Sequence, residues 1–308
     1  MNRKILVTGG SGFIGSYLVK KLVQLDNDVT IYSRMSSKKL IEDIYTKIKI
    51  TKGDITNKQQ LEKALKENFD LVINLASNPF VDIVSKFPEE DAKTSIDGTL
   101  NILENIRQKK TPLIYFSTSM VYGKPIELPI TELHPANPTT QYGRNRLTSE
   151  QYCKDYYKKF GIKYLIIRPS QVYGPGRLPL PSSRSGVVGI FVNKLLDNQN
   201  IEINGKGDLL RDFIYIDDVV NATIHLIEKE KYGEIFNIGS GKPTTLKELA
   251  ELCMKKIKPE SAKILYKDPI ASDTDFYLSI DKLRNSGFAP KVSLNEGLDR
   301  YIDWCKKN

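Results

Sequence analysis

The chain has 308 residues, of which 40% are hydrophobic and 27% charged, a balance typical of a soluble globular protein with one large domain and a smaller lobe. Its formal net charge of +9 comes mostly from scattered lysine pairs with acidic residues between them, which argues against a nucleic-acid partner. No apolar run is long enough to cross a bilayer or to form the core of a signal peptide, so we expect a cytoplasmic protein with no membrane partner.

The first two-thirds of the chain alternates short apolar runs with longer amphipathic stretches. Spacings of three and four residues predict helices, as in the run Ile14, Leu18, Leu22 and Leu25. The apolar runs predict buried strands at Lys4–Thr8, Val29–Ser33, Lys49–Thr51, Leu71–Asn74, Leu113–Ser117 and Tyr164–Arg168. Such alternation requires crossover helices between parallel strands, and it therefore predicts a Rossmann-type α/β fold with a doubly wound parallel sheet.

After Arg168 the composition changes to that of a loop, with four prolines between residues 169 and 186. Beyond it, helices are expected at residues 187–196, from Thr245 and near 294–306, and strands at 201–203 and 235–238. Residues 211–227 are expected to form a further ordered segment between them. We predict a main domain over residues 1–173 and a smaller C-terminal α/β lobe over 174–308. The segment around 212–250 is expected to return to the main sheet.

A glycine-rich turn joins the first strand to the first helix. Gly9, Gly12 and Gly15 are three residues apart, and Gly10 completes a G-x-G-x-x-G spacing with the last two. Glycine permits the tight turn and the close approach of a pyrophosphate, and the helix N-terminus offers N–H groups to the phosphates. The pattern predicts a dinucleotide site that also includes Phe13 and Ile14.

The second predicted strand ends in Ser33-Arg34, where NAD enzymes usually place an acid for the adenine ribose. A hydroxyl donor and a cation suit a 2′-phosphate instead, so NADP is favoured and NAD stays open. Asp54, which is followed by Ile55 after the third strand, suits the adenine amino group. It can equally be the cap of the next helix.

Tyr142 and Arg146 lie four residues apart at the start of a predicted helix, so both face the same way. A cation one turn from a phenol stabilises phenolate, which can exchange a proton with a substrate hydroxyl. Thr118 follows the fifth strand at the carboxyl edge of the sheet, where open α/β sheets bind ligands. The three residues together predict a catalytic group.

The chain resembles, over nearly its whole length, an extended short-chain dehydrogenase/reductase of the nucleotide-sugar epimerase/dehydratase kind. The segments that carry the resemblance are Thr8–Gly15, Asn74-Leu75-Ala76, Gly98-Thr99, Phe116–Gly123, Tyr142–Arg146, Arg168–Gly176 and Arg211–Asp218. The resemblance implies that Tyr142 is the acid/base, with Thr118 as its hydroxyl partner and Arg146 beside it. It further implies that the smaller lobe binds the substrate's nucleoside diphosphate, with Arg211 on the phosphates.

The resemblance extends to other site residues and to assembly. Leu75, Ala76 and Ser77 are expected at the cofactor, and Ser119, Met120, Gln171 and Arg177 at the nucleotide sugar. Helices at about 91–108 and 142–159 form a dimer interface in many relatives, so a homodimer is expected.

The chain departs from the family pattern at several positions. Arg146 replaces the usual lysine, keeping the charge without the capacity to shuttle a proton. Ser119 and Met120 stand where dehydratases have an Asp-Glu pair, which disfavours dehydration and decarboxylation. Gln171 replaces an asparagine, and an expected phosphate-binding arginine is missing from residues 268–278.

Simple hydride chemistry remains as the expected activity. NADPH-dependent reduction of a 4-keto sugar nucleotide is favoured by Ser33-Arg34. The first alternative is a 4-epimerase with bound NAD(P), and the second is a dinucleotide-binding sensor or scaffold with little turnover. The sequence shows no Cys/His cluster with metal-ligand spacing, so no metal site is expected.

Overall fold

The computed structural model describes residues 2–34, 38–77, 87–177, 186–270 and 274–308. Its contacts group the chain into two compact units. The first unit contains residues 1–123, 136–168 and 223–236, and the second contains residues 124–135, 169–222 and 237–308. Residues 169–173, expected in the main domain, group with the second unit. Residues 223–236 are part of the segment expected to return to the main sheet, and they group with the first unit. The predicted boundary at residue 173 stays a prediction.

A seven-stranded sheet has the order β10-β6-β5-β4-β1-β2-β3. The strands are β1 (Lys4–Thr8), β2 (Asp28–Ser33), β3 (Lys49–Lys52), β4 (Leu71–Asn74), β5 (Leu113–Phe116), β6 (Tyr164–Pro169) and β10 (Glu234–Ile238). Every pair from β3 to β6 is parallel. Because the strand order reverses between β1 and β4, the carboxyl ends of these strands form a switch point, where such sheets bind ligands. The predicted Rossmann-type fold is confirmed.

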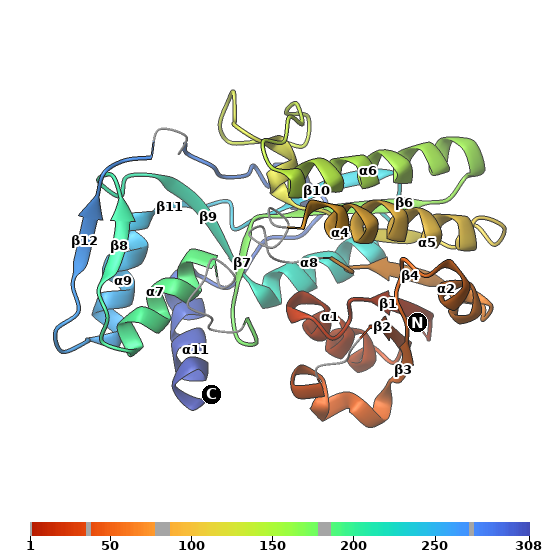
Figure 1. Ribbon diagram of the computed structural model, residues 1–308, viewed down its shortest axis with the longest axis horizontal. Helices are drawn as coiled ribbons and strands as arrows, with labels where there is room; N and C mark the ends of the chain where they lie inside the picture. Colours follow the sequence, from red (N-terminus) through yellow and green to blue (C-terminus); the bar gives the residue numbers. More distant parts are fainter. Residues whose placement is uncertain (1, 35–37, 78–86, 178–185, 271–273) are drawn as a thin grey trace. The chain divides into compact units, whose positions relative to one another are not determined.

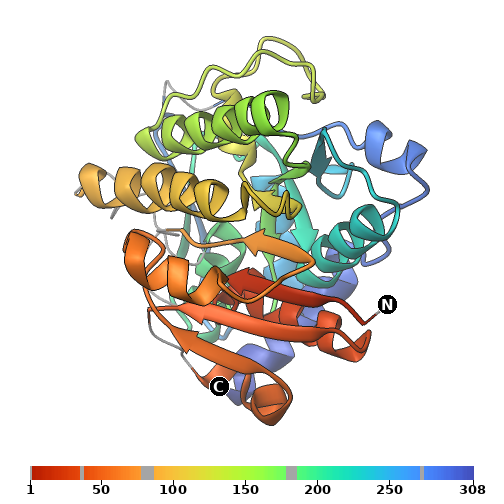
Figure 2. The ribbon, with the colours of Figure 1, turned by 90° about the vertical axis from the view of Figure 1, so that its right-hand side faces the viewer.

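Helices cover the faces of this sheet. The helices are α1 (Phe13–Gln24), α2 (Lys58–Leu65), α4 (Pro88–Ala92), α5 (Gly98–Ile106) and α6 (Gln141–Phe160), with a π-helical turn η3 (Lys93–Asp97) between α4 and α5. Short 3-10 turns are η1 (Lys38–Leu40), η2 (Glu42–Lys47) and η4 (Ser119–Tyr122). α5 and α6 lie side by side on one face, and α1 lies on the other (Figures 1 and 2). Apolar strand residues pack between these layers, and Leu6, Val72 and Ile166 are fully buried.

The six strands expected from apolar runs are present, each within two residues of its expected ends. The segment expected as a loop after Arg168 contains a short strand, β7 (Gln171–Tyr173). The later part of that expected loop, residues 178–185, lies outside the described residues. A three-residue strand escapes a sequence search because it is too short to show periodicity.

The second unit contains two small sheets. One has the order β11-β9-β7, with β9 (Leu210–Tyr215) and β11 (Pro243–Thr245), and the other pairs β12 (Ile264–Lys267) with β8 (Ile201–Asn204). Its helices are α7 (Gly186–Leu196), α9 (Leu246–Ile257), α10 (Asp281–Asn285) and α11 (Leu294–Lys307), while α8 (Ile216–Glu228) runs from the second unit into the first. The helix expected from Thr245 begins there because Thr245 and Glu248 form a capping box.

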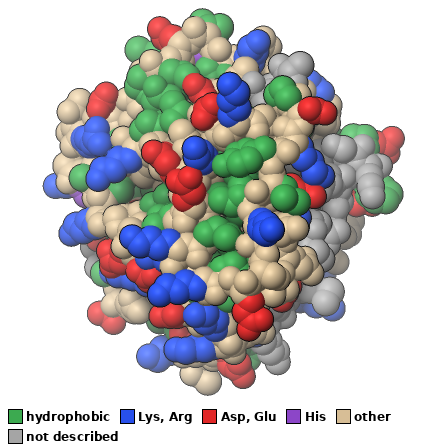
Figure 3. Space-filling view, turned by 90° about the vertical axis from the view of Figure 1, so that its left-hand side faces the viewer, with side chains coloured by type: hydrophobic (Ala, Val, Ile, Leu, Met, Phe, Trp, Pro, Cys, Tyr) green, Lys and Arg blue, Asp and Glu red, His purple; other side chains and the backbone are tan. Residues whose placement is uncertain are grey.

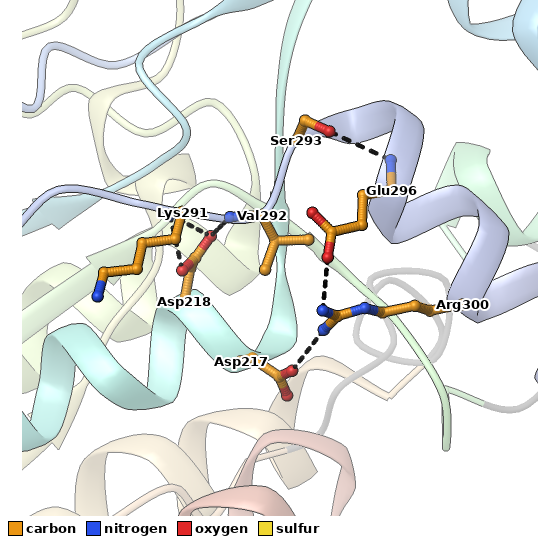
Figure 4. A network of polar contacts seen from close by, with 7 residues as sticks. All are labelled: Asp217, Asp218, Lys291, Val292, Ser293, Glu296 and Arg300. Carbon is orange, nitrogen blue, oxygen red and sulfur yellow. Dashed lines mark hydrogen bonds and ion pairs between the residues drawn. The ribbon is translucent and has the colours of Figure 1, made fainter.

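Charged side chains tie the last helix of the second unit to the start of α8 (Figure 4). Asp218 accepts hydrogen bonds from the backbone N–H groups of Lys291 and Val292, at 2.8–3.0 Å. Arg300 of α11 pairs with both Asp217 and Glu296. The buried Asp218 therefore fixes the chain just before α11 begins.

None of the helices in the described residues is long and apolar enough to span a membrane. On the face of the molecule in Figure 3, basic and acidic side chains are interspersed with hydrophobic ones. This mixture matches the scattered lysine pairs of the sequence.

Candidate functional site

The glycine turn after β1 leaves no room for a side chain at Gly9 or Gly15. A Cβ atom at Gly15 would lie 2.3 Å from the carbonyl oxygen of Gly9, and one at Gly9 would lie 2.8 Å from the backbone carbon of Leu75. Gly9 also has a φ of +68°, which side chains disfavour. The Gly12 N–H donates to the Gly9 carbonyl at 3.0 Å and closes the turn. Backbone therefore packs on backbone where β1 passes into α1.

Helix α1 begins directly after this turn, and its N-terminus has the features of an anion site. Gly12 is the N-cap residue, no side chain caps the helix, and the first turn contains no acidic residue. Phe13 and Ile14 are its first two residues. The positive end of the helix dipole is therefore not neutralised by a carboxylate at this point, and the arrangement suits a phosphate group.

A buried polar network fixes the next strand beside the glycine turn. The Thr8 hydroxyl donates to Asn74 Oδ1 at 2.7 Å, and Asn74 Nδ2 donates to the Thr99 hydroxyl at 3.2 Å. The Ala76 N–H donates to Asn74 Oδ1 at 3.1 Å. The segment containing Leu75, Ala76 and Ser77 is thereby held at the carboxyl edge of the sheet, and the Ser77 hydroxyl has no hydrogen-bond partner among the described residues. The contact of this segment with a cofactor stays a prediction.

Ser33 and Arg34 lie at the carboxyl end of β2. The Ser33 hydroxyl is buried and without a partner in the described part of the chain, whereas the Arg34 side chain is 61% exposed and has its Nε 3.9 Å from Asp54. Asp54 accepts from the N–H and hydroxyl of Thr56. The structure decides against the alternative role of Asp54 as a helix cap, because Asn57 caps α2 and accepts from the Gln60 N–H.

Ile55 lies differently from the other expected cofactor residues. Its side chain is buried in the core, and a Cβ atom at Gly98 would come within 2.4 Å of its Cδ1 atom. The Ile55 side chain therefore does not face a ligand. Nearby, burial raises the pKa of Tyr32 to about 12, and its hydroxyl donates to the Asp54 carbonyl.

The expected catalytic residues come from two neighbouring elements. Thr118 lies two residues beyond the end of β5 and caps η4, with its hydroxyl accepting from the Met120 N–H. Tyr142 is the second residue of α6, whose N-cap is Thr140. A Cβ atom at Gly143 would lie 2.7 Å from the Met120 carbonyl oxygen. The glycine beside Tyr142 therefore lets α6 approach the turn that carries Thr118, Ser119 and Met120.

Arg146 is 1% exposed and lies between two phenol rings. Its guanidinium carbon is 5.1 Å from the ring centre of Tyr142 and 6.0 Å from that of Tyr115. Nη1 donates to the Tyr115 hydroxyl at 3.3 Å, while Nε and Nη2 have no partner among the described residues. The expected pairing of Arg146 with Tyr142 is thus present, and the guanidinium keeps its charge at any ordinary pH.

Sequence reasoning missed several residues around this group. Tyr115 looked like an ordinary strand residue, because a tyrosine in an apolar run signals only burial. Asp91 is fully buried in α4 and accepts from Asn145 Nδ2 at 2.6 Å. The Ser95 carbonyl in the π-helical turn accepts from the hydroxyls of Thr99 and Ser149. Such turns often occur at functional sites, yet no local pattern predicts one.

A buried ion pair contacts residues on both sides of Thr118 in the chain. Arg168 of β6 donates through Nε and Nη2 to both oxygens of Glu150, at 2.9 and 2.5 Å. The Ser117 hydroxyl donates to the same carboxylate at 2.5 Å, and Arg168 lies 4.7 Å from the ring centre of Tyr122. The pair therefore secures both ends of the segment that contains Thr118.

The remaining expected substrate residues belong to the second unit. Gln171 is exposed at the start of β7, and Arg177 donates through Nη1 to the Val172 carbonyl. Arg211 in β9 donates to the carbonyls of Leu210 and Thr274 at 2.8 Å. These bonds hold the two arginines against nearby backbone. Within the described ranges, no three His, Cys, Asp or Glu side chains are grouped as a metal site.

The residues of the first unit fit a dinucleotide. The glycine turn forms a cradle that a side chain at Gly9 or Gly15 would obstruct, and the adjoining helix N-terminus has no side-chain cap. Buried polar atoms that lack partners in the described residues lie along the same edge, at Ser33, Ser77 and Arg146. Buried polar groups are normally satisfied, so these atoms are suited to a polar ligand.

Comparison with known proteins agrees with this geometry. A family model described as the NAD dependent epimerase/dehydratase family matches residues 5–239. A putative UDP-glucose 4-epimerase of Methanocaldococcus jannaschii is 36% identical over 99% of both chains. The dTDP-4-dehydro-6-deoxyglucose reductase of Escherichia coli is 30% identical over 97% of this chain and 96% of the reductase. The structure of the Thermotoga maritima UDP-glucose 4-epimerase with UDP-glucose superimposes with a TM-score of 0.91 at 33% identity, covering 100% and 99% of the two chains.

Proposed function

Since the chain belongs to the NAD dependent epimerase/dehydratase family, we propose that it is a nucleotide-sugar 4-epimerase acting on a UDP-hexose. The relatives named as UDP-glucose 4-epimerases support this choice over the reductase that the sequence alone favours. The family establishes an NAD-dependent enzyme of the epimerase or reductase type. The sugar and the direction of reaction are our proposal.

The observation that carries the proposal is the pair of residues after Thr118. Ser119 and Met120 supply no second carboxylate, so nothing at these positions can remove a proton from a neighbouring sugar carbon. Epimerisation at C4 needs one reversible proton transfer at the hydroxyl and one reversible hydride transfer, with the 4-keto sugar turning over between them so that hydride returns to its opposite face. The arrangement of Thr118 and Tyr142 matches that requirement.

Each residue has a definite task in this reaction. Tyr142 takes the proton from the C4 hydroxyl and returns it, while Thr118 donates a hydrogen bond to the same oxygen. The Arg146 guanidinium, 5.1 Å from the Tyr142 ring centre, offsets the negative charge that develops on this side chain as the proton moves. The dinucleotide, when bound by the glycine turn and α1, supplies reversible hydride transfer at C4.

The direct test is incubation of the protein with UDP-glucose and separation of UDP-galactose from it by chromatography. We expect interconversion without net change in NADH absorbance, and a loss of two or more powers of ten in turnover for Tyr142→Phe with cofactor affinity retained. Net oxidation or reduction of the cofactor would contradict the epimerase. Tight cofactor binding with no turnover on any nucleotide sugar would instead support a sensor or scaffold.

A second candidate is NADPH-dependent reduction of a 4-keto sugar nucleotide. Arg34 beside Ser33 supports it because this pair suits a 2′-phosphate, and so does the similarity to the Escherichia coli reductase. Steady NADPH consumption with a 4-keto substrate would identify this activity. Arg34→Ala should then weaken NADPH binding about tenfold and leave NADH binding unchanged.

Other features of the activity stay proposals. We assign Arg211, Arg177 and Gln171 to the nucleotide portion of the substrate, which Arg211→Ala would test through a raised KM. A homodimer in the cytoplasm remains our expectation, and light scattering of the purified protein measures its oligomeric state.

A further inference from the structure

Arg146 stands where a lysine is usual in the family pattern. Its guanidinium is larger than a lysine ammonium and must be kept in one orientation to act on Tyr142. No carboxylate of the described residues pairs with it, and the nearby Asp91 is bonded to Asn145 and Ser95 instead. We propose that the hydroxyl of Tyr115 is the positioning group that holds the Arg146 guanidinium against the ring of Tyr142. This inference rests on the proposed function, because it concerns the same acid/base.

The contacts of Arg146 single out Tyr115. Nη1 is the nitrogen with protein partners in the described residues, namely the Tyr115 hydroxyl at 3.3 Å and the Phe116 carbonyl at 3.5 Å. The second contact is at the limit of a hydrogen bond. Loss of the Tyr115 hydroxyl would therefore leave the guanidinium with one marginal contact.

Tyr115 is itself well placed to act as a fixed anchor. It lies in the central strand β5 and is fully buried, and burial raises the pKa of its phenol, so the hydroxyl stays protonated and accepts from Nη1 through its lone pairs. The strand cannot shift without breaking its pairing with β4 and β6. The anchor thus fixes Nη1 and leaves Nε and Nη2 for a ligand.

A lysine at position 146 would not need this anchor. Its ammonium nitrogen ends where the guanidinium carbon lies, one bond short of Nη1. The Tyr115 hydroxyl should therefore matter in the presence of the arginine and matter little in an Arg146→Lys background. Non-additivity of the two substitutions is the signature of direct coupling.

The experiment compares Tyr115→Phe, Arg146→Lys and the double variant, with Tyr164→Phe as the matched control. Tyr164 is a buried tyrosine in the neighbouring strand β6 and does not contact Arg146. UDP-glucose epimerisation is measured across pH, and NADH binding is measured by fluorescence titration. The charged or titratable groups around Arg146 are Tyr115 on β5, Tyr142 on α6 and Asp91 on α4.

We expect Tyr115→Phe to lower kcat at neutral pH about five- to tenfold with KM changed less than twofold, since the cation moves away from the phenol. The acidic limb of the kcat profile should move to higher pH, because phenolate is then less stabilised. Tyr164→Phe should match the wild type, and Tyr115→Phe should have less than a twofold effect in the Arg146→Lys background.

Equal effects of Tyr115→Phe in both backgrounds, or a kcat loss without movement of the acidic limb, would overturn the proposal. If the wild type reduces a 4-keto sugar instead, the same comparison applies with that assay. If the wild-type protein turns over neither substrate, the proposed function fails. The fluorescence titration with NADH then tests whether Tyr115 positions Arg146. Tyr115→Phe should then weaken NADH binding about threefold, and unchanged binding would refute that role.

Discussion

Replacement of Arg146 by methionine should lower activity and raise stability together. The guanidinium lies 5.1 Å from the Tyr142 ring centre. At an effective dielectric constant of about 20, a unit charge about 5 Å from the negative charge that develops on the phenol in the transition state contributes about 3 kcal/mol, or roughly two powers of ten in rate. Turnover at neutral pH should fall by about that factor, because methionine fills the space without the charge.

The stability of the same variant should move the other way. Arg146 is a buried cation with two nitrogens unpaired among the described residues, and each unsatisfied buried donor costs about 1–3 kcal/mol. Methionine has no polar hydrogen to satisfy, so the variant should be more stable by roughly 1–3 kcal/mol.

Turnover assays across pH and thermal melting without added nucleotide measure the two effects. The expected result is about a hundredfold lower kcat with a melting temperature raised by a few degrees. A methionine variant with wild-type turnover, or one that melts below the wild type, would refute the reasoning.

Three further changes test other parts of the structure. Gly15→Ala should abolish NADH binding or folding, because the new Cβ would lie 2.3 Å from the Gly9 carbonyl oxygen. Gly12→Ala is the control: its Cβ would lie 3.2 Å from the same oxygen, and circular dichroism should show normal folding. Arg168→Met should lower the free energy of unfolding, measured by urea denaturation, by about 3–5 kcal/mol, because Glu150 would stay buried without its ion-pair partner. A smaller loss would argue against a stabilising role of that ion pair. Burial raises the pKa of Asp212, so its protonated form stabilises the fold at low pH and this contribution is lost as pH rises through the raised pKa. Asp212→Asn should therefore gain melting temperature over the wild type as the pH rises above about 4, and a constant difference would contradict this.

The sequence predicts the parts of the fold that depend on local pattern. Apolar runs locate the strands, and the spacing of Gly9, Gly12 and Gly15 locates the phosphate turn, because backbone packing tolerates no Cβ at Gly9 or Gly15. The four-residue spacing places Tyr142 and Arg146 on one face of α6.

Other features depend on contacts between distant segments. The partner of Arg146 is Tyr115, which lies 31 residues earlier on a different element. The buried Asp91 meets Asn145 across 54 residues, and no spacing rule joins them. For Asp54, the sequence is compatible with both a ligand-binding role and a helix-capping role. The hydrogen bond from the Gln60 N–H to the Asn57 side chain shows that Asn57, not Asp54, caps the helix.

The order of strands in the main sheet has a consequence for biosynthesis. Strand β10 forms one edge and pairs with β6, although more than sixty residues separate the two strands in the chain. While the ribosome is still making those residues, the outer edge of β6 has no β10 to pair with. Unpaired edges template association with other chains. A nascent or truncated polypeptide that stops before Glu234 should therefore depend on a chaperone to stay monomeric, whereas in the finished chain β6 is paired with β10.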